Sequence, residues 1–370
     1  MDRCVVALSS NSNQDEALKE VLQQLEFHES KPILIILFSE LSLLPYCTKK
    51  IKERYPDSTV IGSTTYVNFS SEGYSHGGLS VMAINSGIEC SCGLLFDANH
   101  YPSLYKEHIR LALEKLSSTE NTCCLAFTTA FGNGEDLVLD TFHELLEGTG
   151  ISLFGGSSGA AVDEKQTLVA LNGDVYVNTC AFVFIHNLNG KISFFKENIY
   201  KPTIHKFIAT DIDCDEQLVY EYNNQPAADI LAETLGTDLD GLQQKLTEHP
   251  MGRIVNNEIY ITESNEVKLD GAISYFARIY NHTKMVLLEV DDFQKVWKET
   301  SERVAAEVEK PSFSISINCL SRSKLFEKEN CFSEFVNGLR KYGSFIGLSG
   351  YGEQLDIIHL NQTMILAVFE

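Results

Sequence analysis

The chain has 370 residues, of which 44% are hydrophobic and 22% charged, and its formal net charge at neutral pH is −22. This length exceeds the roughly 100–200 residues of a typical domain, so it predicts two packed halves or one large composite domain. The negative charge disfavours nucleic acid and anionic membranes as partners, because phosphate groups are bound by clustered Lys and Arg.

The apolar runs are short: stretches such as 33–38 and 181–185 fall far below the roughly 20 residues that a membrane-spanning helix needs. The first residues lack the basic and then apolar pattern of a targeting segment. The ten cysteines show no regular framework and no Cys-x-x-Cys pair, which favours reduced, buried thiols. We therefore expect a cytoplasmic protein that does not insert into a membrane.

A recurring unit can be recognised three times along the chain, within residues 33–84, 124–185 and 313–369. Each copy reads as an apolar strand, a helix, a strand ending in glycine and small hydroxyl residues, and a returning strand. About 30 residues separate the first strand from the Gly-rich turn, which suits a strand, loop, helix and return. The sequence therefore predicts internally duplicated halves.

Between the second and third copies the pattern changes to strand-like runs at 258–262, 272–280 and 285–290, followed by a helix at 293–309. The helices carry apolar residues on one face, as expected for helices that cover a sheet. We predict an α/β fold of the mixed α+β type: a layered sandwich of mixed β-sheets covered by helices, in two internally similar halves, 1–205 and 206–370.

Several segments, taken together in this order and spacing, resemble the FIST family. They are Ile-Gly-Ser-Thr-Thr at 61–65, Phe-Gly-Gly-Ser-Ser-Gly at 154–159, and the motifs at 171–174, 219–227, 318–322, 350–353 and 359–363. The first turn departs from the family in lacking the Gly-Glu that often follows it, whereas the third copy keeps Gly352 and Glu353. The resemblance covers nearly the whole chain and assigns 1–205 to a FIST N-terminal domain and 206–370 to a FIST C-terminal domain.

The resemblance implies a sensory module of signal transduction that binds a small ligand, either amino-acid-like or haem. Its partners would be a histidine kinase of a two-component system, a chemoreceptor or a cyclic-dinucleotide enzyme. One branch of the family binds haem to sense nitric oxide, so haem is the cofactor that membership of that branch would imply, and the resemblance itself fixes no cofactor.

Ligand-binding residues are expected at the Gly-rich turns and in the C-terminal motifs, in a cleft where the turns of the two halves face each other. Glycine allows close backbone approach, and serine hydroxyls are compact donors and acceptors. The candidates are Gly62, Ser63, Thr64, Gly155, Gly156, Ser157, Ser158, Cys319, Arg322, Gly352, Glu353 and Asn361.

Two of the C-terminal positions have alternative interpretations. Arg322 either forms a structural ion pair, with Glu353 as its nearest candidate partner, or binds a ligand carboxylate through its guanidinium. His359, Asn361 and Thr363 would share one face of a strand. His359 is then either a hydrogen-bonded core residue or, if haem is bound, its axial ligand, which requires a wide apolar pocket and a free imidazole nitrogen.

Two further motifs each have a functional and a structural interpretation. Residues 155–159 match G-x-S-x-G, but a serine nucleophile elbow needs a helix after the serine, and 166–171 reads as a strand. A hydrolase using Ser157 is therefore the disfavoured alternative, and no enzyme is expected. Residues 131–136 open a helix and could hold an anion on free amides. Because Glu135 and Asp136 already place negative charge there, a helix cap is favoured.

The leading hypothesis is a sensor that binds a small ligand and regulates a partner signalling enzyme, with a haem-based nitric oxide sensor as the alternative. The stretch 200–216, with its proline and acidic run, is predicted to connect the halves. A ligand would then act by shifting their relative placement.

Overall fold

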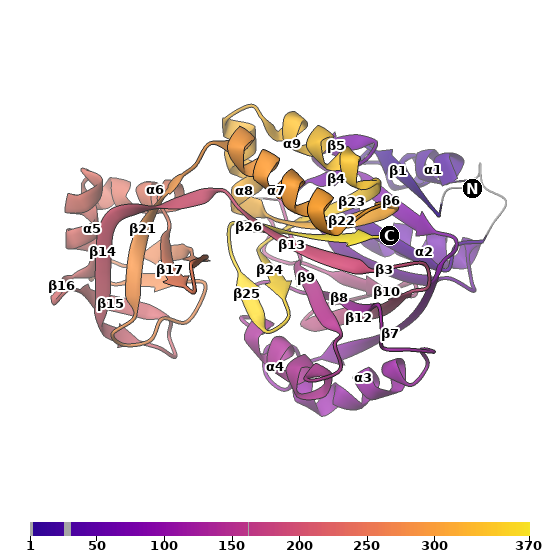
Figure 1. Cartoon of the computed structure of the whole chain (residues 1–370), viewed down its shortest axis with the longest axis horizontal. Helices are drawn as coiled ribbons and strands as arrows, with labels where there is room; N and C mark the ends of the chain where they lie inside the picture. Colours follow the sequence, from indigo (N-terminus) through magenta and orange to yellow (C-terminus); the bar gives the residue numbers. More distant parts are fainter. Residues whose placement is uncertain (1–2, 26–30, 162) are drawn as a thin grey trace. The chain divides into compact units, whose positions relative to one another are not determined.

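A computed structural model describes residues 3–25, 31–161 and 163–370 (Figure 1). The chain forms two compact units. Unit 1 comprises Met1–Glu197, Thr300–His359 and Met364–Glu370, and unit 2 comprises Asn198–Glu299 and Leu360–Thr363. Helices and strands alternate with mixed parallel and antiparallel pairing, which confirms the predicted mixed α/β fold of sheets covered by helices.

Unit 1 contains three six-stranded sheets. The first has the order β1 (Cys4–Ser9), β6 (Leu79–Ile84), β2 (Leu34–Ser39), β3 (Thr59–Thr64), β10 (Val169–Leu171), β11 (Asp174–Tyr176). The second has the order β7 (Ile88–Phe96), β12 (Thr179–Asn187), β8 (Thr122–Thr128), β9 (Ser152–Ser157), β24 (Gly352–Leu355), β25 (Ile358–Leu360). The third has the order β13 (Ile192–Asn198), β26 (Thr363–Phe369), β22 (Phe313–Cys319), β23 (Ser344–Gly350), β4 (Asn68–Ser70), β5 (Gly73–Ser75).

The three sheets follow one plan, which confirms the threefold repeat predicted from the sequence. In each sheet, the first four strands of the order given above come from one repeat. The third and fourth of these strands are parallel: β2 with β3, β8 with β9, and β22 with β23. The remaining hairpin comes from another repeat. The β4–β5 hairpin joins β23, the β10–β11 hairpin joins β3, and β24 joins β9. This cyclic exchange of hairpins ties the three repeats into one unit.

Helices cover the outer faces of these sheets. They are α1 (Gln14–Leu25), α2 (Leu44–Arg54), α3 (Lys106–Leu113), α4 (Glu135–Leu146), α8 (Leu320–Lys328) and α9 (Phe332–Leu339), with short 3-10 turns η1 (Pro102–Tyr105) and η2 (Arg340–Tyr342). α7 (Phe293–Glu307) runs from unit 2 into unit 1.

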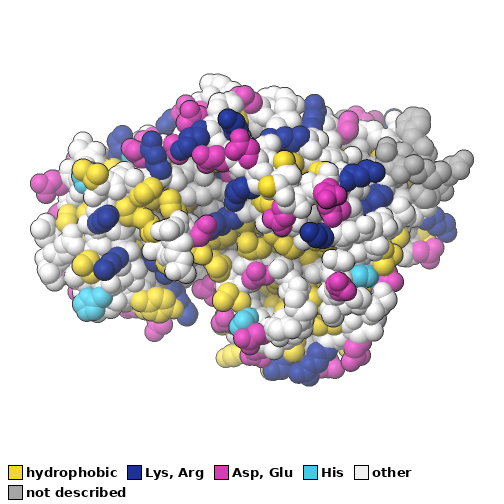
Figure 2. Space-filling view, viewed as in Figure 1, with side chains coloured by type: hydrophobic (Ala, Val, Ile, Leu, Met, Phe, Trp, Pro, Cys, Tyr) yellow, Lys and Arg dark blue, Asp and Glu magenta, His cyan; other side chains and the backbone are white. Residues whose placement is uncertain are grey.

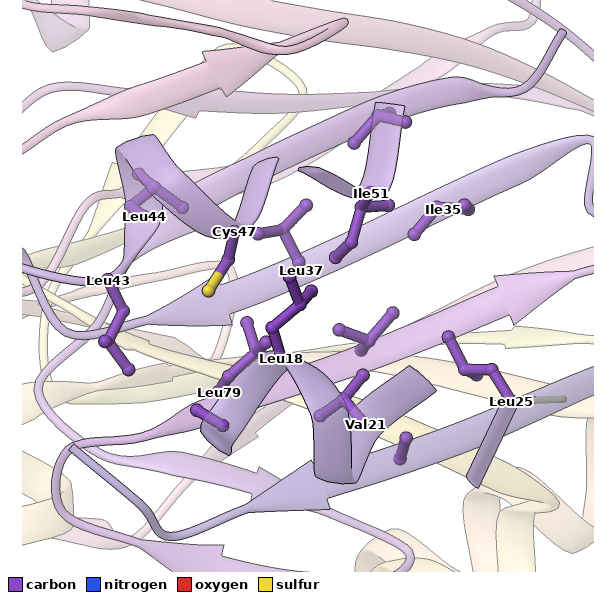
Figure 3. Close-up of a cluster of buried hydrophobic side chains, with 14 of the residues drawn as sticks. Leu18, Val21, Leu25, Ile35, Leu37, Leu43, Leu44, Cys47, Ile51 and Leu79 are labelled. Atoms are coloured by element: carbon purple, nitrogen blue, oxygen red, sulfur yellow. The ribbon is translucent and has the colours of Figure 1, made fainter. Parts of the chain in front are cut away.

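Alternation along β2 shows how the sequence sorts the two faces of a sheet. Ile35 and Leu37 pack under the apolar face of α1 and α2 (Figure 3). Phe38 points to the opposite face, where its ring lies edge-on to the ring of Phe127 in the second sheet, with the ring centroids 5.3 Å apart. Because both faces are buried, the strand reads as a continuous apolar run rather than an alternating one.

Unit 2 is a single sheet with two helices, α5 (Ala227–Leu235) and α6 (Leu239–Glu248). Its strand order is β18 (Glu258–Thr262), β17 (Met251–Val255), β21 (Lys284–Val290), β14 (Tyr200–Asp213), β15 (Leu218–Tyr222), β20 (Ile273–Tyr275), β19 (Ser264–Val267), with β16 (Gln225–Pro226) paired to β15. One face of this sheet packs on the helices through a core that includes Phe207, Met285 and Leu287.

The structure corrects two local predictions. Residues 200–216 do not form a connector: 200–213 are strand β14, and the proposed 205/206 boundary falls inside it. His359, Asn361 and Thr363 do not share a strand face, because β25 ends at Leu360 and β26 begins at Thr363. Gln362, between these strands, has a positive φ of 54°, which marks a turn.

Candidate functional site

The three Gly-rich turns meet in the interior of unit 1. The Ser63 hydroxyl donates to the Ser158 hydroxyl at 2.8 Å, and the backbone amide of Gly159 donates to the Thr64 carbonyl at 2.9 Å. The amide of Tyr66 donates to the Ser349 carbonyl of the third turn, also at 2.9 Å. The predicted convergence is therefore confirmed, but it produces a closed core: Ser63, Thr64, Ser157 and Ser158 are all fully buried.

Close packing explains the glycines at these turns. A Cβ on Gly156 would lie 2.7 Å from the Ile317 side chain and 2.6 Å from the Gly352 carbonyl. A Cβ on Gly62 would lie 2.8 Å from both the side chain and the carbonyl of Leu37, and one on Gly155 would overlap the Ala126 carbonyl. These positions need glycine so that neighbouring strands can approach, whatever else the turns do.

Ser157 lies at the end of β9 and donates to Glu135 Oε1, at the start of α4, at 2.7 Å. β9 continues into a loop, not into a helix, so 155–159 is not the strand, turn and helix of a nucleophile elbow. The hydrogen bond ties the second turn to the first turn of α4. It also places the carboxylate of Glu135 at the helix start, as the cap interpretation of 131–136 predicts.

Arg322 forms a buried ion pair, but with Glu197 and not with Glu353. Its Nη2 contacts the Glu197 carboxylate, and its Nη1 donates to the Glu197 carbonyl at 3.0 Å. The guanidinium also lies over the rings of Phe326 and Phe335, at 5.0 and 5.5 Å. Arg322 is a fully buried residue of α8, and Glu197 belongs to β13, so this ion pair anchors α8 to the third sheet.

The other C-terminal candidates are also interior residues. Cys319 caps the start of α8 and is 1% exposed. Gly352 and Glu353 pair with Ser157 and Gly156 across β24 and β9, and Glu353 is fully buried. Asn361 lies in the turn after β25 with its Nδ2 buried and without a partner among the described residues.

His359 has one of the two features that the haem interpretation requires. Its Nε2 is buried and has no hydrogen-bond partner in the described part of the chain, as axial ligation would require. The second feature is a wide apolar pocket, and the cavities beside α4 and over the sheet of unit 2 are not lined by His359. No group of three or more His, Cys, Asp or Glu in those ranges is arranged to hold a metal ion.

A cavity of about 230 Å³ lies beside the turn core, and we call it the loop pocket. It is lined by Ala98, Asn99, Thr129, Ala130, Phe131, Gly132, Gly134, Lys165, Gln166, Thr167, Val177 and Asn178. It sits where β8 ends and α4 begins, at the carboxyl end of the parallel β8–β9 pair. Ligands in open α/β sheets bind at this end of the strands.

The backbone between β8 and α4 is strained into a curled loop. Phe131 and Asn133 have positive φ values of 70° and 52°. The bulky Phe131 rarely adopts such an angle, and strained residues of this kind concentrate at binding sites. The amide of Ala130 donates to Thr167 Oγ1 at 2.8 Å, which fixes the loop to the segment that carries Lys165. A Cβ on Gly134 would collide with the Ala98 carbonyl, so only glycine lets the loop close over Asn99.

The pocket holds groups of both hydrogen-bonding kinds. Asn99 Oδ1 is buried and accepts no hydrogen bond from the described residues. Lys165 supplies an exposed ammonium group. The N-cap residue of α4 is Gly134, so no side chain at that position accepts a hydrogen bond from the first amides of the helix. A ligand with a donor for Asn99 and an anionic group for Lys165 would satisfy both. The sequence analysis singled out residues 131–136 as a possible binding segment, but it did not predict Asn99 or Lys165. Neither residue lies in a motif, and only folding brings the two residues to the 131–136 segment.

Profiles of the FIST N domain and the FIST C domain match residues 6–225 and 227–356. The chain belongs to the FIST family. FIST domains are associated with sensory signal transduction, which gives this chain its functional class. A search of curated proteins finds no significant match. No helix among the described residues combines the length and hydropathy needed to cross a bilayer.

Among solved structures, one described as "Cyanuric acid hydrolase: evolutionary innovation by structural concatenation" is similar over 99% of this chain and 98% of its own, with 7% identity and a TM-score of 0.32. A likeness at that TM-score says nothing about the activity of the FIST chain.

Proposed function

We propose that this FIST protein is a sensor in which the loop pocket binds an amino-acid-sized ligand through a carboxylate and an ammonium group. The observation that carries the proposal is the pairing of a buried, unpartnered acceptor, Asn99 Oδ1, with the ammonium group of Lys165 in one cavity. A buried acceptor without a donor costs about 1–3 kcal/mol, which a ligand donor would recover.

The size of the pocket supports a small ligand. Its volume of about 230 Å³ is below the roughly 300–1,000 Å³ typical of sites for drug-sized molecules. An amino acid or a similar organic acid suits that volume, and haem does not. No observation favours the haem alternative over this proposal.

The curled loop offers a way to transmit binding. A ligand alters a partner's affinity only if it binds two conformations of the protein with different free energies. The loop between β8 and α4 carries one strained residue, Phe131, so ordering or releasing the loop is the change that the pocket could control. We propose that a signalling enzyme, such as a histidine kinase, a chemoreceptor or a cyclic-dinucleotide enzyme, is the recipient.

The test is calorimetry on the whole chain with the common amino acids, each paired with its amine analogue that lacks the carboxylate and its acid analogue that lacks the ammonium group. At least one amino acid is expected to bind more tightly than both analogues. Lys165→Gln should weaken that binding by about 10- to 100-fold, because hydrogen bonds to charged groups contribute about 1.5–3 kcal/mol. Lys115→Gln, an exposed lysine outside the pocket, serves as the matched control and should change nothing.

The proposal fails if no member of the panel binds. It also fails if an amino acid binds equally well to the wild type and to Lys165→Gln, because the ligand would then be held elsewhere.

A further inference from the structure

The sheet of unit 2 has a second face that α5 and α6 do not cover. Phe207, Ala209 and Met285 point to the helix-covered core, so the residues between and beside them along β14 and β21 point to the other face. Lys206 pairs with Val286 across these strands, and Ile208 pairs with Lys284. The open face is therefore composed of apolar and basic side chains.

A groove of about 470 Å³ runs over this face. We call it the sheet groove, and it is lined by Lys206, Phe207, Ile208, Asn223, Ile254, Lys284, Met285 and Val286. Ile208 and Ile254 are 40% and 47% exposed, and the neighbouring Val255 is 49% exposed. Figure 2 shows hydrophobic side chains, with Lys or Arg beside them, gathered over β14 and β21. Apolar side chains exposed together in a groove indicate an interaction site rather than ordinary surface.

The charge of the groove is unlike that of the chain. Two lysines and no Asp or Glu line it, in a protein whose net charge is −22. Neither Lys206 nor Lys284 forms an ion pair among the described residues. Two basic side chains without acidic partners, set beside exposed isoleucines, complement a ligand that is acidic and apolar together.

We propose that the sheet groove docks a short segment of a partner protein in which apolar residues are flanked by Asp or Glu. The apolar residues would cover Ile208 and Ile254, and the carboxylates would pair with Lys206 and Lys284. A second copy of the chain fits less well, because a twofold contact through this face would bring the same lysines together. Two lysines are also too few to hold an anionic membrane against the charge of the whole chain. The proposal does not depend on the loop pocket.

Selection of a random 12-residue peptide display library on the immobilised full chain tests this. Enriched peptides are expected to combine Asp or Glu with Leu, Ile or Phe, and a synthetic copy of the best one should bind in fluorescence anisotropy. Lys206→Glu with Lys284→Glu should weaken that peptide at least tenfold, and so should Ile254→Asp. Arg278→Glu, an exposed arginine of unit 2 outside the groove, should leave it unchanged.

Circular dichroism and melting curves of each variant show that it is folded, so loss of binding reports on the groove. Enriched peptides without acidic residues, or unchanged binding by the double lysine variant, would overturn the proposal. It would also be overturned by self-association in sedimentation that Ile254→Asp abolishes, because the face would then be an interface between copies. Binding of dodecanoate or anionic vesicles in the groove without selection of any peptide would likewise overturn it.

Discussion

Removal of the Arg322 guanidinium should destabilise unit 1 strongly. Arg322 is fully buried, and the Glu197 side chain is 3% exposed, so Arg322→Ala leaves a buried carboxylate without its partner. Removing one partner of a buried ion pair lowers the free energy of unfolding by about 3–5 kcal/mol. The lost ring contacts with Phe326 and Phe335 add to this cost.

At roughly 2–4 °C per kcal/mol for a domain of this size, the melting temperature should fall by about 6–20 °C. Urea unfolding followed by circular dichroism measures the change in free energy. Arg110→Ala, on the surface of α3, is the control and should have little effect, because its ion pair with Glu107 is exposed at both ends.

A double variant separates the ion pair from simple loss of volume. Arg322→Met with Glu197→Leu removes both charges, and it should recover much of the stability that either single change loses. If Arg322→Ala melts within about 2 °C of the wild type, the reasoning is refuted, and a ligand role for Arg322 returns as the better interpretation.

The remaining predictions concern backbone packing, thiols, the loop pocket and the sheet groove. Gly155→Ala should lower the free energy of unfolding in urea by at least about 3 kcal/mol, because the new Cβ would overlap the Ala126 carbonyl. Gly148→Ala is the control and should lower it by about 1 kcal/mol, because the space around Gly148 is open. Equal losses for the two variants would contradict the packing argument. Burial raises the pKa of both Cys47 and Cys180 to about 12, so these thiols stay protonated and unreactive at pH 8. When the native chain is treated with iodoacetamide and analysed by mass spectrometry, labelling should be confined to the partly exposed cysteines, Cys90, Cys92, Cys214 and Cys331. Native labelling of Cys47 would show that the first sheet opens. Lys165→Gln should weaken amino-acid binding in calorimetry by about 10- to 100-fold. Lys206→Glu with Lys284→Glu should weaken the selected peptide in anisotropy at least tenfold while amino-acid binding is retained.

Apolar patterning was enough to predict the repeated strands and the helices α2, α4, α7 and α9, but not α1, α3, α5, α6 or α8. The helix that residues 131–136 were expected to open is α4, whose Val138, Leu139 and Phe142 place one apolar face on the sheet. The exchange of hairpins was not predictable in this way. The β4–β5, β10–β11 and β24–β25 hairpins are short and join sheets of other repeats, and nothing in strands of three or four residues specifies a distant edge.

The site was less accessible to sequence reasoning than the fold. The Gly-Ser turns were recognised, but a glycine at a closely packed strand and a glycine at a ligand look the same in a sequence. Arg322 was singled out correctly as a buried charge, yet its partner Glu197 is 125 positions away and lies in no motif. Asn99 and Lys165 were missed for the same reason, since loops carry little periodic signal.

Hydrogen exchange read by mass spectrometry tests the central claim most directly. The whole chain is compared with and without the amino acid that binds best in calorimetry, at saturating concentration. The account predicts slower exchange in peptides covering 129–134 and 164–167, and no change at 61–65, where the turn core is already closed. Protection that appears only outside the loop pocket, with 129–134 and 164–167 unchanged, would contradict it.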